Sequence, residues 1–195
     1  MTDCRVDILP LEAARESAKE VGMIPAFADL NIFRVMLHRP KTAKALSDLL
    51  VSLLFGGELD DRLRELLIMR IGWVTGSDYE WTQHWRIAQE QFGCSEQDLL
   101  ELRGDWRSST HFGDDEKTLL AAVDSLIEQG TLSSDLASEC LGRLGRNATI
   151  ELATAVGAWR LVSKVTNALE IPLEEGISSW PPDGKGPQAP LVKGS

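Results

Sequence analysis

The fold is decided by a stretch that reads DDRLRELLIMRIGWVT over residues 60–75 and GSDYEWTQHWRIAQEQF over residues 76–92. The first part is apolar on nearly every side of a helix, and a helix of that kind is buried. Gly76 ends it, and Ser77 followed three residues later by Glu80 has the spacing of a capping box at the start of a second helix. The stretch therefore predicts two adjoining helices, the first of them inside the protein.

The remainder of the chain has the same helical character. Apolar residues recur at intervals of three and four, and no alternating strand pattern of useful length occurs. We therefore predict an all-α fold of about eight helices joined by short loops. Beyond the two helices above, helices are expected at 11–21, 27–38, 41–55, 114–129, 133–145 and 147–169, with a short one beginning at Ser95.

The chain of 195 residues suits one domain with a tail. We predict a single helical domain over residues 1–175. Residues 176–195 are rich in glycine, proline and serine, which is typical of an extended or flexible segment. Trp180 is unusual in such a segment, and one hypothesis is that it docks on a neighbouring subunit.

Charge and cysteine content narrow the classes of function. The formal net charge is -10, from 30 acidic and 20 basic residues, which argues against nucleic acid or an anionic membrane as the main partner. The three cysteines include no CxxC pair, so a dithiol redox motif and a zinc ribbon are not encoded. No apolar run approaches the roughly 20 residues of a membrane-spanning helix, and the expected location is the cytoplasm.

The residues most suited to catalysis are Glu65 and His84. Glu65 is a carboxylate within an otherwise apolar helix, where loss of hydration suits general acid–base chemistry. His84 lies on the next helix, and an imidazole both accepts and gives protons near neutral pH. The alternatives are structural: Glu65 paired with Arg62, with Arg64 or with an arginine on another helix, and His84 as a packed helical histidine.

Several neighbours are weaker candidates. Glu80 lies one turn before His84 and is predicted either as a catalytic carboxyl or as part of the capping box. Tyr79 is the one tyrosine of the chain and is a candidate donor to a substrate oxyanion. Candidate substrate-binding residues are Arg70, through a forked contact to a carboxylate, and Trp81 and Trp73, through an apolar wall.

The run RELLIMRIGWVTGSDYEWTQHWRIAQEQFGCS resembles the carboxymuconolactone decarboxylase and alkylhydroperoxidase D-like family. Weaker similarity extends to residues 31–40, 156–162 and 167–169, so that it covers most of residues 28–172. The resemblance implies an all-helical fold whose subunits associate as trimers or hexamers. It also implies that Glu65 and His84 occupy the positions of the family's proton-relay glutamate and histidine.

In the peroxidase branch of that family a CxxC precedes the histidine, and its two positions fall on Ser77 and Glu80 here. Without a thiolate at either position, dithiol peroxide reduction is disfavoured. In the decarboxylase branch the substrates are carboxylated lactones and no cofactor is needed. The resemblance then implies that His84 moves the proton, that Glu65 orients it, and that Tyr79 or Arg70 stabilises an enolate oxygen.

The sequence alone thus favours a cofactor-free lyase or isomerase that acts on a small carboxylated lactone or keto acid. It contains no HExxH, carboxylate cluster, glycine-rich phosphate loop or GxSxG motif, so no metal site or nucleotide site is predicted. Two alternatives remain open. One is an alkylhydroperoxidase-like activity, and the other is a non-catalytic helical oligomer that binds a ligand.

Overall fold

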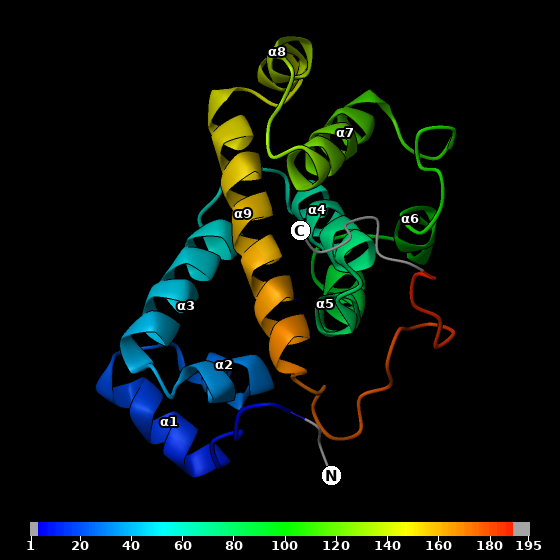
Figure 1. Ribbon diagram of the computed structural model, residues 1–195. Coiled ribbons are helices and arrows are strands. Elements are labelled where there is room, and N and C mark those ends of the chain that lie inside the picture. The colour runs from blue at the N-terminus through cyan, green and yellow to red at the C-terminus, as the bar shows by residue number, and fades with distance from the viewer. Residues whose placement is uncertain (1–3, 189–195) are drawn as a thin grey trace. The chain divides into compact units, whose positions relative to one another are not determined.

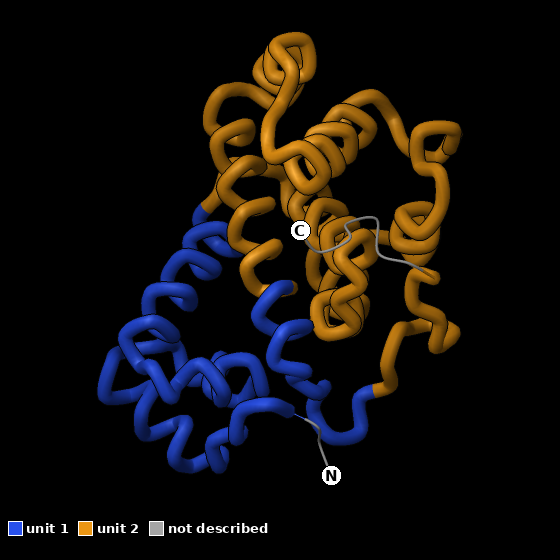
Figure 2. Tube along the Cα trace, viewed as in Figure 1, with its two compact units in different colours: residues 1–56, 164–177 blue, residues 57–163, 178–195 orange. Residues whose placement is uncertain are grey.

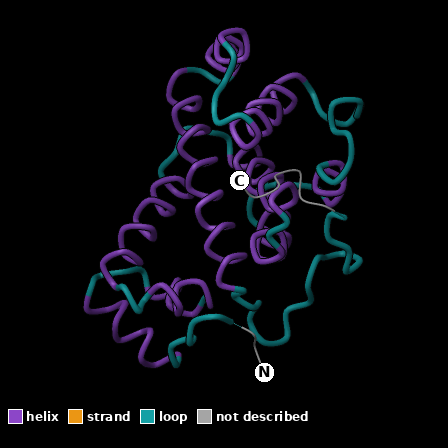
Figure 3. Tube along the Cα trace, in the orientation of Figure 1, coloured by secondary structure: helices purple, strands orange, loops and turns teal. Residues whose placement is uncertain are grey.

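The computed structural model describes residues 4–188, and every regular element within them is a helix (Figures 1 and 3). The predicted all-α class is confirmed. The elements are α1 (Leu11–Glu20), the 3₁₀ helix η1 (Pro25–Asp29), α2 (Asn31–Met36), α3 (Pro40–Phe55), α4 (Asp61–Thr75), α5 (Asp78–Glu90), α6 (Glu96–Glu101), α7 (Asp114–Glu128), α8 (Ser134–Arg143) and α9 (Arg146–Leu169).

One expected helix is wrong, because residues 27–38 form two elements instead of one. Leu30 is extended, with φ -83° and ψ 134°, and it separates η1 from α2. The backbone N–H of Asn31 donates to Glu174 Oε1 at 2.8 Å, and the Asn31 side chain donates to the carbonyl of Pro172 at 3.1 Å. These partners come from a distant part of the chain, so helical periodicity alone does not reveal the break.

The chain divides into two compact units, which Figure 2 distinguishes by colour. Unit 1 comprises residues 1–56 and 164–177, and unit 2 comprises residues 57–163 and 178–195. The predicted division into a domain of residues 1–175 and a tail stays a prediction.

Unit 1 has a small core of its own. Helix α1 packs against η1, α2 and α3. Ala14 and Ala18 are the buried residues of α1, and their small side chains allow close approach of the neighbouring helices. The rings of Phe27 and Phe33 lie 4.9 Å apart between centroids, within the usual range for aromatic pairs.

Unit 2 is built around α4. This helix packs against α5, α6 and α7, and α7 in turn packs against α8. Because α4 has neighbours on several sides, residues 64–72 are all buried, as the sequence predicts. Leu66, Leu67 and Ile68 have no exposed surface. Any polar side chain on this part of α4 is therefore removed from water.

Helix α9 is the longest helix, with 24 residues. It carries charged side chains along its length, among them Glu151 and Arg160. None of the helices within residues 4–188 is both long enough and apolar enough to cross a membrane.

Candidate active site

Glu65 lies near the start of α4, at the centre of unit 2. Asp60 caps this helix by accepting a hydrogen bond from the backbone N–H of Leu63 at 3.1 Å. The exposed fraction of Glu65 is 0 %. A carboxylate without contact to water needs a partner inside the protein, because burial of an unpaired charge is strongly unfavourable.

The junction between α4 and α5 turns the chain back on itself. Gly76 has φ 64° and ψ 32°, a left-handed conformation that glycine adopts at little cost. The N–H of Ser77 donates to the carbonyl of Gly72 at 2.9 Å, and the Ser77 side chain accepts from the N–H of Glu80. A Cβ at Gly72 would lie 3.0 Å from the backbone nitrogen of Trp81, so glycine permits the close approach of the two helices.

Glu65 and His84 form a direct hydrogen bond across this helical hairpin. His84 Nδ1 lies 2.8 Å from Glu65 Oε2. An ionised carboxylate only accepts hydrogen bonds, so Nδ1 carries a proton and Nε2 is the nitrogen left to exchange one with another molecule. The His84 side chain is 14 % exposed and that of Glu65 is fully buried, so the imidazole is the accessible member of the pair.

The surroundings of His84 favour its protonated form. Burial lowers the pKa of the imidazole, but the charge and hydrogen bond of Glu65 raise it, as does the nearby charge of Glu80, and the net shift is upward. The ring of Trp159 stands edge-on to the imidazole, with 6.2 Å between centroids. The site thus stabilises an imidazolium while part of the ring remains open to solvent.

Glu80 is the third titratable group of the site. It is 4 % exposed, and burial raises its pKa to about 7, with the charge of His84 opposing this shift and that of Glu65 adding to it. The carboxyl is therefore close to half protonated at neutral pH, which suits general acid–base work. A reciprocal capping box forms elsewhere, at the start of α6, between Ser95 and Asp98.

Arg64 also lies at this site. Its side chain is 2 % exposed, and Nη1 donates to Asp61 Oδ1 at 2.7 Å. Its guanidinium stands over the ring of Phe92, 4.9 Å from the centroid. Arg64 Nε is 3.9 Å from Glu65 Oε1, and both atoms are buried without a hydrogen-bond partner among the described residues.

The structural alternative for Glu65 named two arginines. Arg62 instead pairs with Asp98 and Glu116, and Arg64 meets Glu65 only at the outer limit of an ion pair. The sequence signal that indicates Glu65, a charge within an apolar helix, applies equally to Arg64.

The predicted substrate-binding arginine is already engaged. Arg70 Nε and Nη2 donate to the two carboxylate oxygens of Asp124, at 2.8 and 3.0 Å, and Nη1 donates to the carbonyl of Leu102 at 2.8 Å. Its forked contact is therefore made within the protein, between α4 and α7. A role in binding substrate stays a prediction, and the same holds for Tyr79, which is 4 % exposed.

Trp73 and Trp81 belong to an aromatic cluster. Their ring centroids are 5.0 Å apart, and Trp81 is fully buried with its indole N–H donating to the carbonyl of Pro181 at 2.8 Å. Trp180 completes the cluster, 5.7 Å from Trp73, and its backbone N–H donates to Asp78 Oδ1 at 3.0 Å. Trp180 thus docks within its own chain, where the sequence suggested a neighbouring subunit.

The thiols have an environment that disfavours reactivity. Cys94 and Cys140 are buried, and burial raises the pKa of both, that of Cys94 to about 12. Within residues 4–188 no group of three or more His, Cys, Asp or Glu side chains is arranged to hold a metal ion.

Comparison with known proteins places the helices of this site in a known family. Residues 40–125, which include α4 and α5, match the carboxymuconolactone decarboxylase family. This segment belongs to that family. The match contains Glu65, Glu80 and His84, so the whole titratable cluster lies in the family region. No curated protein matches the chain significantly.

Solved structures share the fold over most of the chain. A protein of unknown function from Agrobacterium tumefaciens, whose name links it to the antioxidant defence protein AhpD, is 22 % identical, with a TM-score of 0.64 over 71 % of this chain and 96 % of its own. A peroxidase-related protein with an AhpD core from Ralstonia eutropha JMP134 is 14 % identical, with a TM-score of 0.70 over 90 % and 94 %. The debrominase Bmp8, in complex with 2,3,4-tribromopyrrole, is 16 % identical, with a TM-score of 0.67 over 85 % and 86 %. At these identities the likeness shows the fold.

Proposed function

We propose that the protein is a cofactor-free acid–base lyase or isomerase that acts on a small carboxylated lactone or keto acid. The observation that carries the proposal is the 2.8 Å hydrogen bond between buried Glu65 and partly exposed His84. Glu80, with a pKa of about 7, adds a second group able to hold a proton near neutral pH. The family of residues 40–125 and the fold shared with a debrominase support an enzyme.

In an isomerisation, His84 Nε2 removes a proton from a carbon beside a carbonyl group. The electron pair of the C–H bond moves toward the carbonyl oxygen and forms an enolate. Glu65 stabilises the imidazolium that results, since its carboxylate holds Nδ1–H. Return of the proton to a different carbon completes the reaction.

In a decarboxylation, the bond between the carbon and the carboxylate breaks, and carbon dioxide leaves. The electron pair stays on the substrate as an enolate, and His84 in its protonated form gives a proton to the carbon. The developing negative charge on the enolate oxygen needs a donor. Glu80 in its neutral form, or Tyr79, supplies that donor in our proposal, because the donors of Arg70 are taken by Asp124.

The alternative of a thiol peroxidase is weaker. The positions of the CxxC hold Ser77 and Glu80, and the raised pKa of Cys94 leaves little thiolate at neutral pH.

The alternative of a non-catalytic binding protein makes Glu65 and His84 a structural pair. Substitution of either residue then lowers stability without any reaction being lost.

Association of subunits as trimers or hexamers, which the family resemblance implies, is part of the proposal. Ile150 and Leu161 on α9 are 61 % and 45 % exposed, and their spacing of three helical turns places them on one face. Exposed apolar side chains on one face are a common feature of contacts between subunits. The molar mass in solution, from light scattering, tests this point.

Hydrogen–deuterium exchange at carbon tests the proposed chemistry without knowledge of the exact product. A panel of small keto acids and carboxylated lactones is incubated with the protein in D₂O, and proton NMR follows the signal of the carbon beside the carbonyl. We expect at least one compound to exchange or lose carbon dioxide faster with the wild type than with the Glu65→Gln/His84→Gln double variant. Equal rates for both proteins across the panel, with the double variant folded, would exclude acid–base catalysis by this pair.

A further inference from the structure

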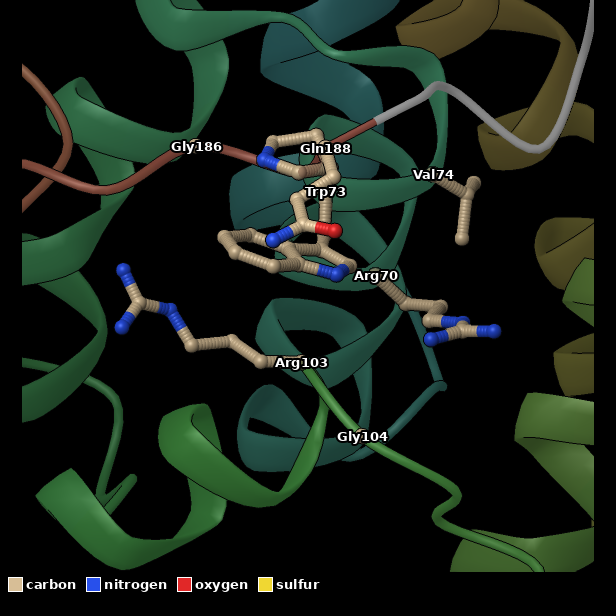
Figure 4. A pocket seen from close by; sticks show the side chains of 8 residues that line it. Arg70, Trp73, Val74, Arg103, Gly104, Gly186 and Gln188 are labelled. Carbon is tan, nitrogen blue, oxygen red and sulfur yellow. The ribbon is translucent and has the colours of Figure 1, made fainter.

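A cavity of about 400 Å³ lies in unit 2 between α4, the residues after α6 and the C-terminal segment (Figure 4). Its volume is within the range of sites for small molecules. Its lining includes Arg70, Trp73 and Arg103 but none of the three titratable groups of the candidate active site. In the view of Figure 4, the two arginine side chains lie on either side of the Trp73 ring.

Arg103 lines this cavity and has a free donor on its guanidinium group. Its guanidinium carbon lies 4.7 Å from the centroid of the Trp73 ring. Nη2 donates to Asp183 Oδ1 at 2.9 Å and to the carbonyl of Lys185 at 2.8 Å, whereas Nη1 makes no hydrogen bond within residues 4–188. Nε is buried, out of reach of a ligand. A free N–H of a charged group favours an ionised oxygen as its acceptor.

The two charged side chains that line the cavity, Arg70 and Arg103, are both basic. They pair with Asp124 at 2.8 Å and with Asp183 at 2.9 Å, and neither carboxylate lines the cavity. A lining without acidic side chains stands out in a chain whose formal net charge is -10, and it favours an anionic ligand.

We propose that this cavity binds a small aromatic carboxylate. The ring lies against the indole of Trp73, since aromatic rings attract one another in offset or edge-on arrangements. The carboxylate accepts a hydrogen bond from Nη1 of Arg103, and Gln188, which lines the same cavity, is an additional side-chain donor.

This binding site is independent of the proposed reaction. Trp73 contacts Trp81 of α5 at 5.0 Å, so an occupied cavity borders the helix that carries His84. Binding nevertheless requires neither Glu65 nor His84. The Glu65→Gln/His84→Gln variant therefore binds the aromatic carboxylate as the wild type does, even if the proposed catalysis fails.

NMR titration of the full chain with benzoate tests the proposal. The chain has six tryptophans, and the indole N–H signal of Trp73 is assigned from its loss in Trp73→Phe. We expect benzoate to shift this signal in a saturable manner at millimolar concentrations, and benzyl alcohol, which has the ring without the charge, to bind at least about ten-fold more weakly.

Arg103→Gln is expected to weaken benzoate binding at least about ten-fold. Arg107→Gln is the matched control, because Arg107 also stacks on a tryptophan, 4.3 Å from the centroid of Trp106, and pairs with a carboxylate, but does not line the cavity. If Arg103→Gln does not fold, Arg103→Lys replaces it, since lysine keeps the charge and lacks the forked donors of the guanidinium group.

Three results overturn the proposal: no saturable shift of the Trp73 signal with benzoate, equal affinity for benzyl alcohol, or unchanged affinity in the folded Arg103 variant. The comparison of benzoate with benzyl alcohol uses only the wild type, so it tests the proposed binding site even if no variant folds.

Discussion

Two histidine–carboxylate pairs of unit 2 have the same hydrogen-bond length and very different surroundings. His84 Nδ1 lies 2.8 Å from Glu65 Oε2, and His111 Nε2 lies 2.8 Å from Asp98 Oδ1. Asp98 also accepts hydrogen bonds from Arg62 and from the backbone and side chain of Ser95. The second oxygen of Glu65 has no hydrogen-bond partner among the described residues.

The titratable groups of the two sites also differ in the direction of their pKa shifts. Burial raises the pKa of Asp98, but hydrogen bonds from Arg62, Ser95 and His111 together hold it well below its usual range. Near Glu65, the pKa of His84 is raised above its usual value, and the pKa of Glu80 is raised to about 7. Asp98 with its several donors gives a stable link between helices, whereas burial beside Glu65 leaves Glu80 able to gain or lose a proton near neutral pH.

The largest difference between the His84–Glu65 pair and the His111–Asp98 pair is expected in catalysis. His84→Gln should lower the rate of carbon-bound hydrogen exchange by a factor of ~100 to 10,000, the usual contribution of a general acid–base group. His111→Gln is the matched control, since it removes a histidine with an equally short bond to a carboxylate, and its rate should stay close to that of the wild type. Rates are measured by proton NMR in D₂O. Equal losses in the two variants would contradict the assignment of the site to His84.

The next difference is in stability. Asp98→Asn leaves Arg62 without its buried partner and should lower the free energy of unfolding by about 3 kcal/mol. Glu116→Gln is the control, because Glu116 is the second and more exposed partner of Arg62, and it should cost less than about 1 kcal/mol. Urea unfolding followed by circular dichroism measures both. Glu65→Gln should cost less than Asp98→Asn, because glutamine can keep the single hydrogen bond to His84.

The smallest effect is a change in how stability depends on pH. The pKa of Glu80 rises from 4.5 to about 7 on folding, so the folded protein holds more protons than the unfolded chain between these values. Stability is therefore lost as the pH rises through this window, by about 3 kcal/mol for a shift of this size. The raised pKa of His84 acts in the same direction, with stability that is present below its unfolded value and lost as the pH rises through the folded one.

Glu80→Gln removes one of these two contributions. Its free energy of unfolding, relative to the wild type, should be higher at about pH 8 than at about pH 5, by about 2 kcal/mol, because part of the contribution of Glu80 is already lost at pH 5. Glu90→Gln on the same helix is the control, because the Glu90 side chain is exposed. A constant difference between Glu80→Gln and the wild type at both pH values would mean that Glu80 is ionised throughout.

Much of the architecture could be predicted from the sequence because it depends on local patterns. The apolar run over residues 60–75 specifies a buried helix, and Gly76 with Ser77 specifies its end and the next beginning. The prediction that Glu65 pairs with His84 rests on the family resemblance and on the presence of a charged residue, Glu65, in an apolar helix. The helix patterns depend on residues that are close together in the chain, and the helical period relates such residues to positions on a helix.

Other features were decided only by the tertiary structure. The break at Leu30 depends on Glu174, the fork of Arg70 is taken by Asp124, and Trp180 docks on its own aromatic cluster. In each case the partner is distant in sequence, and no local pattern states which donor meets which acceptor. The sequence by itself determined most of the helices and indicated Glu65 and His84 as a candidate proton-transfer pair. The tertiary structure decided how many hydrogen-bond donors each buried carboxylate receives, because that number depends on which helices lie side by side. The number of donors distinguishes the Glu65 site from the Asp98 site.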